Sequence, residues 1–215
     1  LEPVGRNTAP AIALACMDLP KEEIVLVTPS DHLIKDQEAY EKALKRAEGL
    51  AQLGHLVTFG ITPAYAETGF GYIESKDGEN VDGFYEKPNQ ETALAYIKTG
   101  HYFWNSGMFC FRAGVFLEEL QKYSPKIYEA SIRAYQNAKK DNILRINHDD
   151  MINIPKDSID YALMEKSNKV KVVPSNIKWS DVGSFDSLHK ELTKDTNGNT
   201  SNQHHIAIES KNNFI

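Results

Sequence analysis

The sequence predicts an α/β protein with a doubly wound, mostly parallel sheet, and three observations support this fold class. Short apolar runs that suit strands alternate along the chain with longer stretches whose apolar residues recur at helical spacing. Ile24–Val27 is a continuous apolar run, the pattern of a strand that is covered on both faces. Leu56–Gly60 is the next such run and follows a helical stripe, an order that implies a parallel strand pair with a right-handed crossover.

The first two helices are marked by their caps. Asn7 or Thr8 can cap the first helix, and Ala9–Leu14 is apolar nearly all round, which predicts that this helix is buried. Pro10 lies in its first turn, where a missing N–H costs nothing. Asp36 caps the second helix, which ends before Gly54. The apolar stripe of the second helix consists of Tyr40, Ala43, Leu44, Ala47, Leu50 and Ala51.

The alternation continues to about residue 192. Further strands are predicted near Phe84, at Met108–Arg112 and at Lys169–Val173. Further helices are predicted at Thr92–Lys98 before Gly100, at Val115–Tyr123, after Pro125, after Asp157 and from Ser184. A polar stretch begins near Thr193, and His204–Ile208 and Asn213–Ile215 are predicted to be strands of a separate element. We therefore expect two parts, residues 1–192 and residues 193–215.

Composition and charge exclude several classes of protein. The chain has 215 residues, of which 41% are hydrophobic and 25% charged, so a disordered tail or a disulfide-stapled mini-protein is excluded. A net charge of −6 argues against a nucleic-acid partner. The apolar runs are shorter than the ~20 residues of a membrane span, and no basic-then-apolar leader opens the chain. Cys16 and Cys110 lie in apolar runs, as buried thiols do in a reducing compartment, so we expect a cytoplasmic protein.

Two aspartates lie where ligands bind in sheets of this type. Asp31 follows the strand Ile24–Val27, and Asp181 follows the apolar pair Ile177 and Trp179. Two converging carboxylates could hold a Mg²⁺ ion that keeps several waters and binds phosphate oxygens. Taken alone, however, each aspartate is more often a turn or helix-cap residue than a ligand.

Three further segments place polar groups at strand ends. Glu67–Ile73 contains two glycines between aromatic residues, which lets the backbone approach a ligand, although a bulged hairpin has the same pattern. Glu86 and Lys87 precede a proline, and Asn105 begins another strand; these groups can read sugar hydroxyls, although solvated turns look similar. Arg6 at a helix N-terminus is a candidate site for phosphate or a nucleobase.

Other enzyme classes lack their sequence signatures. No two of the seven histidines have the i, i+4 spacing of a helical zinc site. The chain contains neither a Gly-x-Ser-x-Gly nucleophile elbow nor a Walker phosphate loop. Hydrolase and P-loop kinase functions are therefore not supported.

The polar segments recur in a fixed order that is more specific than any one of them. They are Glu2-Pro3-x-x-Arg6-Asn7-Thr8-Ala9-Pro10-Ala11, Pro29-Ser30-Asp31-His32, Glu67-Thr68-Gly69-Phe70-Gly71-Tyr72-Ile73, Phe84-x-Glu86-Lys87-Pro88, Trp104-Asn105-Ser106-Gly107-Met108-Phe109, Ser158-Ile159-Asp160-Tyr161-Ala162 and Trp179-Ser180-Asp181-Val182-Gly183. Over nearly all of residues 1–190 the chain resembles the bacterial mannose-1-phosphate guanylyltransferase family, in the long form often fused to a mannose-6-phosphate isomerase domain.

The resemblance implies a fold and a reaction. The fold would be a Rossmann-like, doubly wound mixed sheet of the nucleotidyltransferase type, with residues 193–215 as a linker and the start of a C-terminal β-helical element. The reaction would convert GTP and mannose 1-phosphate to GDP-mannose and pyrophosphate with Mg²⁺, as a step of polysaccharide biosynthesis. The family frequently forms homodimers, and neither nucleic acid nor membrane is an expected partner.

The resemblance also assigns roles to residues. Asp31 and Asp181 would hold Mg²⁺, and with Lys87 near phosphate they would form the catalytic set. The mannose side would consist of Gly71, Glu86, Asn105 and Asp160, with Ser158, Ile159 and Tyr161 shaping the same end. The nucleotide side would consist of Glu2, Arg6 and Asn7.

Positioning and metal electrostatics would then carry the chemistry, because a sugar phosphate is already a nucleophile at neutral pH and needs no general base. The family's glycine-rich phrase Gly-x-Gly-Thr-Arg-Leu-Trp-Pro belongs N-terminal to Glu2, and the chain begins at Leu1 without it. We therefore expect that these 215 residues are a fragment with little or no activity of their own.

Three alternative functions stay open at this stage. The protein could be another hexose-1-phosphate nucleotidyltransferase, since no residue chemistry here reads guanine or mannose. It could act as a mannose-6-phosphate isomerase through a downstream domain. A non-catalytic sugar-nucleotide sensor is the third, but the presence of both Asp31 and Asp181 disfavours it.

Overall fold

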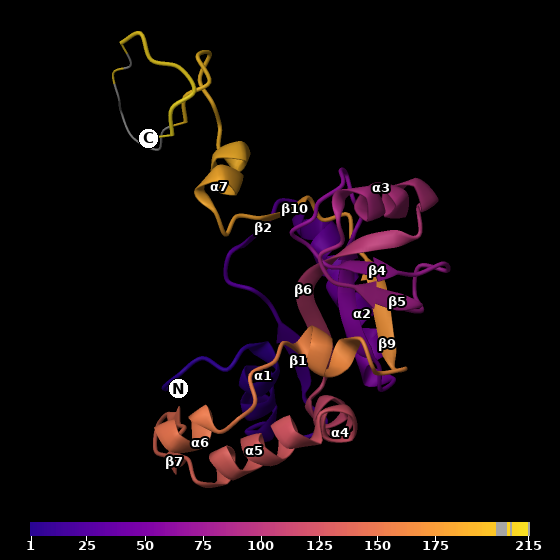
Figure 1. The fold of residues 1–215 in the computed structure, drawn as a ribbon, viewed down its shortest axis with the longest axis vertical. Coiled ribbons are helices and arrows are strands. Elements are labelled where there is room, and N and C mark those ends of the chain that lie inside the picture. Colours follow the sequence, from indigo (N-terminus) through magenta and orange to yellow (C-terminus); the bar gives the residue numbers. More distant parts are fainter. Residues whose placement is uncertain (201–205, 207, 215) are drawn as a thin grey trace.

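The computed structural model describes residues 1–200, 206 and 208–214. Figure 1 shows a twisted central sheet with helices on both faces and a C-terminal segment that projects away from it. The helices are α1 (Thr8–Met17), α2 (Gln37–Gln52), α3 (Gln90–Thr99), α4 (Ala113–Tyr123), α5 (Pro125–Gln136), α6 (His148–Ile152), the π-helix η1 (Asp160–Met164) and α7 (Phe185–Glu191). The strands are β1 (Ile24–Val27), β2 (His32–Ile34), β3 (Leu56–Ile61), β4 (Tyr72–Glu74), β5 (Gly83–Tyr85), β6 (Tyr102–Arg112), β7 (Lys139–Lys140), β8 (Leu144–Arg145), β9 (Val170–Pro174) and β10 (Trp179–Asp181).

The long strand β6 organises the six-stranded sheet. Strand β3 pairs along one edge of β6 and β9 follows beyond it, while β4 and β1 pair along the other edge at opposite ends of β6. The sheet is mixed, as the family resemblance implies, but the expectation of a mostly parallel sheet is wrong, because β3–β9 is the one parallel pair among the described strands. β1 and β3 run in the same direction, yet the antiparallel β6 lies between them.

The expectation that strand Ile24–Val27 is covered on both faces is also wrong. Its residues are only half-buried, and Leu26 is 42% exposed. In the described part of the chain β1 pairs with β6 alone, so it lies at an edge of the sheet. A continuous apolar run therefore marks a strand here without marking a central one.

Two apolar cores lie on opposite faces of the sheet, which confirms the doubly wound arrangement. Phe109 and Phe111 of β6 belong to the core that includes α1, α4 and α5. Met108 and Cys110, which alternate with them, belong to the core that includes α2 and α3. This alternation follows from the two-residue period of a strand, since successive side chains point to opposite faces.

The predicted caps are confirmed at the helix ends. The Asn7 side chain accepts a hydrogen bond from the Thr8 N–H at 2.8 Å, and the Asp36 side chain accepts one from the Ala39 N–H at 3.1 Å. Gly100 ends α3 in the left-handed region at φ 72°, which glycine adopts without strain. Both cysteines are free and buried, as expected.

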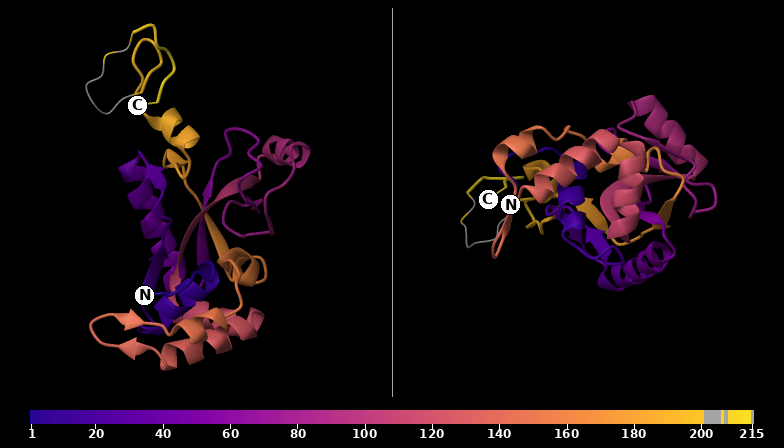
Figure 2. Two further views of the ribbon diagram at one scale, coloured as in Figure 1. Left: turned by 60° about the vertical axis from the view of Figure 1, so that its left-hand side comes forward. Right: turned by 90° about the horizontal axis from the view of Figure 1, so that it is seen from below.

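The C-terminal part differs from the prediction of a β-helical element. α7 begins at the capping residue Ser184, and Figures 1 and 2 show this helix and the following residues projecting from the sheet. Among the described residues beyond 192 only isolated bridges occur, at Lys194–Thr200 and Thr200–Phe214, so the β-helical element is not confirmed. The predicted strand at 204–208 lies largely outside the described residues.

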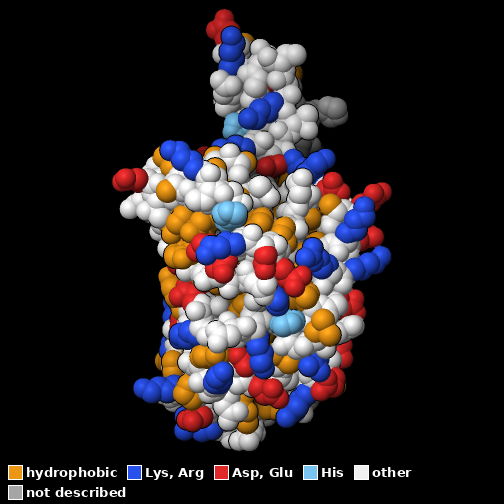
Figure 3. All heavy atoms as spheres, turned by 90° about the vertical axis from the view of Figure 1, so that its right-hand side faces the viewer, with side chains coloured by type: hydrophobic (Ala, Val, Ile, Leu, Met, Phe, Trp, Pro, Cys, Tyr) orange, Lys and Arg blue, Asp and Glu red, His pale blue; other side chains and the backbone are white. Residues whose placement is uncertain are grey.

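The surface carries charges of both signs. On the face drawn in Figure 3, lysine and arginine side chains are interspersed with aspartate and glutamate and with small apolar areas. Within the described ranges no helix combines the length and the apolar character that a membrane crossing requires.

Candidate functional site

The two predicted metal-binding aspartates meet at a short antiparallel pair of strands, which we call the β2–β10 ribbon. Asp181 lies opposite His32, the residue that follows Asp31. The N–H of Val182 donates to the carbonyl oxygen of Asp31 at 3.0 Å. The structure therefore brings together two carboxylates about 150 residues apart in the sequence, through the pairing of β2 with β10 and not at the carboxyl ends of strands of the main sheet.

Gly183 makes room for both carboxylates. A Cβ atom at Gly183 would lie 2.9 Å from Oδ2 of Asp31 and 3.0 Å from Oδ1 of Asp181. The Gly183 N–H donates to Oδ1 of Asp181 at 2.8 Å and fixes that side chain. The two acidic side chains thus border one backbone position, and a Cβ atom there would require at least one carboxylate to shift.

This donor set fits a hard divalent cation that keeps part of its hydration shell. Carboxylate oxygens are the protein ligands that Mg²⁺ prefers, and Mg²⁺ is commonly held by one or two of them together with water and substrate phosphates. In the part of the chain that the structure describes, no group of three or more His, Cys, Asp or Glu side chains is arranged to hold a metal. An ion between Asp31 and Asp181 would therefore complete its shell with water and phosphate oxygens.

The predicted sugar-binding residues Gly71, Glu86, Asn105 and Asp160 form a second group, which we call the polar cluster. The Asn105 N–H donates to the Gly71 carbonyl oxygen at 2.8 Å, and its side-chain amide donates to Oδ1 of Asp160 at 2.8 Å. A Cβ atom at Gly71 would lie 2.6 Å from Oε2 of Glu86. Thr58 on β3 donates its hydroxyl to Oδ1 of Asn105 at 3.2 Å and fixes the amide orientation.

The polar cluster is electrostatically acidic. Burial raises the pKa of Asp160, and the nearby Glu86 carboxylate raises it further, while the hydrogen bond from Asn105 opposes both effects. Burial also raises the pKa of Glu165, again with contributions from Asp160 and Glu86. Several carboxylates thus face one small region, which offers acceptors to hydroxyl donors.

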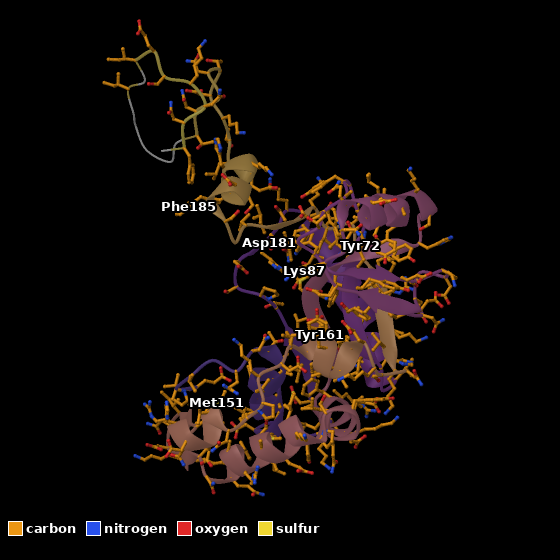
Figure 4. All side chains as sticks on the ribbon, in the orientation of Figure 1. Tyr72, Lys87, Met151, Tyr161, Asp181 and Phe185 are labelled. Atoms are coloured by element: carbon orange, nitrogen blue, oxygen red, sulfur yellow. The ribbon has the colours of Figure 1, made fainter. Side chains whose placement is uncertain are left out.

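Lys87 lies at the border of the polar cluster. Its Nζ is 3.4 Å from Oε1 of Glu86, and its side chain is 63% exposed. Its backbone has φ +45°, an uncommon conformation for a residue other than glycine, and such strain concentrates at functional sites. In the view of Figure 4, Lys87 lies between Asp181 and Tyr161.

The predicted nucleotide-side residues lie at the start of α1. The Nε of Arg6 donates to the carbonyl oxygen of Ile154 at 2.7 Å, and burial raises the pKa of Glu2. The Thr8 hydroxyl accepts a hydrogen bond from the N–H of Ile159 at 2.9 Å, which ties the helix start to the segment that carries Asp160.

Ser158 and Tyr161 lie in the same segment, where the Tyr161 N–H donates to the Ser158 hydroxyl at 3.3 Å. In the described part of the chain, no hydrogen bond or ion pair joins Glu2, Arg6 or Asn7 to the two aspartates. The Thr8–Ile159 hydrogen bond therefore ties the start of α1 to the segment that carries Asp160.

The residues that surround the aspartates were not predicted to be site residues. A hollow of about 770 Å³ adjoins Asp31 and Asp181. Its aromatic wall consists of Tyr65, Phe70, Trp104 and Trp179, and α7 and its cap contribute Ser184, Asp186, Ser187, Lys190 and Glu191. Trp104 directly precedes Asn105, and Trp179 precedes Asp181 by two positions. A large aromatic ring near a predicted polar ligand could therefore have indicated the wall of the hollow.

Comparison with known proteins identifies the family. The family described as "Nucleotidyl transferase" matches residues 1–198. A protein named mannose-1-phosphate guanylyltransferase from Salmonella montevideo is 49% identical in a 212-residue alignment that covers 93% of this chain and 45% of that protein. The xanthan biosynthesis protein XanB of Xanthomonas campestris pv. campestris (strain B100) is 44% identical in a 221-residue alignment that covers 100% of this chain and 47% of that protein.

A solved structure supports the same fold. The crystal structure of a protein named mannose-6-phosphate isomerase from Helicobacter pylori has a TM-score of 0.81 and 47% sequence identity, and the match covers 84% of this chain and 74% of that one. The chain spans about half the length of the curated relatives that it matches.

Proposed function

This chain belongs to the nucleotidyl transferase family, and on that premise we propose that its full-length gene product makes GDP-mannose and pyrophosphate from GTP and mannose 1-phosphate. The observation that carries the proposal is the arrangement of two neighbouring groups: the Asp31–Asp181 carboxylate pair and the polar cluster. The relatives named mannose-1-phosphate guanylyltransferase support the choice of substrates.

Nucleotidyltransferases of this family generally use divalent metal ions, and we propose Mg²⁺ at Asp31 and Asp181. When bound there, the ion supplies positive charge against phosphate oxygens. The carboxylates themselves fix where that charge lies, since the Gly183 N–H holds Asp181 and the Val182 N–H holds the backbone of Asp31.

The polar cluster would orient the mannose ring. The carboxylates of Glu86 and Asp160 can accept hydrogen bonds from sugar hydroxyls, and Gly71 lets the ring approach the backbone. Asn105 is already oriented by Thr58 and Asp160, so its position costs nothing when the sugar binds. This preorganisation favours one hexose orientation.

Lys87 would hold the phosphate of the sugar substrate. Its exposed Nζ contacts Glu86, so the lysine lies beside the proposed sugar position and can neutralise the attacking phosphate. A phosphate monoester is already deprotonated near neutral pH, so no side chain must remove a proton before it attacks the α-phosphate in line. The chain's contribution is therefore binding and alignment of two anions.

Glu2, Arg6 and Asn7 would face the nucleotide. The Arg6 Nε is bonded to Ile154, which leaves the terminal guanidinium nitrogens to contact the nucleotide. We further propose that residues 1–192 are the catalytic part, that residues 193–215 open a β segment, and that the protein works in the cytoplasm, as a homodimer where it oligomerises.

Pyrophosphate release tests the function directly. The full-length gene product is assayed across nucleoside triphosphates and hexose 1-phosphates, with Mg²⁺ and with a chelator. We expect release with GTP and mannose 1-phosphate, lost with the chelator and in Asp181→Ala. Pyrophosphate release with a different substrate pair would keep the reaction type and change the proposed substrates. No release with any pair would contradict the proposal. The 215-residue chain assayed alongside should show little or no turnover.

The alternative of a mannose-6-phosphate isomerase is not favoured. A solved structure with 47% identity carries that name, whereas the relatives that match nearly all of this chain are named mannose-1-phosphate guanylyltransferase.

A further inference from the structure

Four aromatic rings form a continuous line beside the site, and we call them the aromatic row: Trp104, Phe70, Trp179 and His32. The ring centroids of Trp104 and Phe70 are 5.4 Å apart, and those of Phe70 and Trp179 are 5.3 Å apart. Trp179 and His32 are 5.0 Å apart at 86°, and the Trp179 indole N–H donates to Nδ1 of His32 at 3.0 Å. These edge-to-face contacts are the favoured geometry for aromatic pairs.

Each ring stands next to a residue of the proposed site. His32 follows Asp31, and Trp179 precedes Asp181 by two positions on β10. At the other end, Phe70 precedes Gly71 and Trp104 precedes Asn105. The row therefore runs from the carboxylate pair to the polar cluster, and each ring belongs to a residue one or two positions from a residue of the proposed site.

The row crosses between two separate sheets. β2 and β10 are three-residue strands that pair only with each other in the described part of the chain. Asn105 lies on β6 of the main sheet. Phe70 comes from the loop before β4, and it is the one ring of the row that contacts a tryptophan from each sheet.

Three of the rings also share one apolar core. Trp104 is 5% exposed, and the partly buried Phe70 and Trp179 pack against the same core as Trp104. Because each ring of the row lies edge-to-face against the next, a shift of one ring changes the contacts of its neighbour.

We propose that the aromatic row couples the Asp31–Asp181 carboxylate pair to the polar cluster, with Phe70 as the central positioning residue. The inference rests on the proposed function, because the two ligands coupled are the metal ion and the sugar phosphate. Binding of either ligand sets the row in the arrangement that the other requires, and the coupling is reciprocal. Metal and sugar phosphate would thus bind in a mutually aligned geometry.

A second aromatic cluster offers a matched control. Tyr96 on α3 stacks on Tyr102 with centroids 4.0 Å apart and lies 5.4 Å from Tyr72 and 5.3 Å from Tyr85. These rings have similar spacing to those of the row, but within the described residues none of their ring contacts reaches the β2–β10 ribbon. Tyr96→Leu therefore removes an equivalent ring without cutting the row.

The row contains both tryptophans of the chain, so emission excited selectively at tryptophan, without excitation of the ten tyrosines, reports on it. In Trp104→Phe the remaining emission comes from Trp179, beside the carboxylates. We expect mannose 1-phosphate, without metal, to change Trp179 emission although it binds at the polar cluster. Adding Phe70→Leu should abolish that change while calorimetry still detects binding, and adding Tyr96→Leu should leave it intact.

The outcomes separate the row from the proposed function. A Trp179 response that persists in Phe70→Leu, or that is lost equally in Tyr96→Leu, would overturn the coupling. Bound mannose 1-phosphate without any Trp179 response would do the same. No binding of mannose 1-phosphate to the chain, together with no pyrophosphate release by the full-length product, would instead contradict the proposed function on which the coupling rests.

Steady-state kinetics on the full-length product gives an independent measure. The Mg²⁺ activation constant should fall about fivefold or more between low and saturating mannose 1-phosphate, the range of ordinary coupling free energies. We expect the ratio of the two Mg²⁺ activation constants, at low and at saturating mannose 1-phosphate, to approach one in Phe70→Leu. The ratio should be restored in Phe70→Tyr and unchanged in Tyr96→Leu. A wild-type ratio of one, or an unchanged ratio in Phe70→Leu, would contradict the proposal.

Discussion

The β2–β10 ribbon and the polar cluster are built in different ways, although they serve one proposed site. The ribbon consists of two three-residue strands with half-buried side chains. The polar cluster is anchored on the main sheet, where Asn105 of β6 is held by Thr58 of β3 and by Asp160 of η1. The carboxylate pair therefore depends on few local contacts, whereas the cluster is held by the core.

This difference teaches how the two groups can respond to ligands. A pair of short strands adjusts easily, which suits charges that must close on an ion of fixed radius. A cluster held by several hydrogen bonds keeps its shape, which suits discrimination between hexoses. Substitutions in the ribbon should therefore alter metal dependence, and substitutions in the cluster should alter sugar dependence.

Removal of one ribbon carboxylate should have the largest effect. Asp181→Asn or Asp31→Asn keeps the side-chain shape but removes the charge that would hold the metal, so we expect kcat/KM of the full-length product to fall about 100-fold or more. Pyrophosphate release measures the loss, and circular dichroism checks the fold. Asp141→Asn, at an exposed aspartate paired with Lys139, is the matched control. Near-normal activity of both site variants would refute the ribbon's role.

A methyl group at Gly183 should separate metal dependence from sugar dependence. The added Cβ would lie 2.9 Å from Oδ2 of Asp31, so Gly183→Ala must push the carboxylates apart. We expect the Mg²⁺ activation constant to rise by roughly 10–100-fold, as for other changes that misplace a ligand. Gly49→Ala in α2, where nothing lies within 4 Å of the new Cβ, is the control. A normal Mg²⁺ titration of Gly183→Ala would show that the carboxylates do not share this position.

The corresponding change in the polar cluster is Gly71→Ala. Its Cβ would lie 2.6 Å from Oε2 of Glu86, which must move from its place beside the sugar. We expect KM for mannose 1-phosphate to rise about tenfold, with the Mg²⁺ activation constant changed far less. Initial-rate measurements that vary each ligand in turn would check both values. An effect on metal dependence as large as that of Gly183→Ala would erase the distinction between the two regions.

Neutralising Asp160 should have the smallest effect of these substitutions, and the effect should be a gain in the stability of the fold. Because burial raises its pKa in the folded state, the folded protein holds this proton more tightly than the unfolded chain, so stability falls as pH rises above the usual aspartate range toward the raised value. The cost is fully present once the pH lies above the raised pKa, and there Asp160→Asn should raise Tm.

The advantage of Asp160→Asn should disappear in acid, where the wild-type carboxyl is already protonated. Thermal melts between neutral pH and pH values below the usual aspartate range test this trend. The same variant should bind mannose 1-phosphate more weakly, because an amide replaces an acceptor of the polar cluster. A lower Tm at neutral pH would contradict the argument from burial.

Part of the site was predictable from sequence because strand ends meet at one edge of a sheet. That reasoning singled out Asp31 and Asp181, although they meet through the pairing of β2 with β10 and not at the edge of the main sheet, and the motif order placed Gly71, Glu86 and Asn105 in one family pattern. The direction of β6 was not predictable, because the apolar pattern of Met108–Arg112 is the same in parallel and antiparallel strands. β6 also begins six residues before the predicted start at Met108, through a half-polar stretch that alternation alone did not mark.

The sequence by itself determined the local structure: the caps at Asn7 and Asp36, the left-handed Gly100 and the apolar stripes that cover the sheet. These depend on interactions within a few residues. Only the tertiary structure decided that β6 separates β1 from β3, that Gly183 borders two carboxylates and that four distant rings form a row. Such features depend on packing between segments far apart in the chain, which no local periodicity encodes.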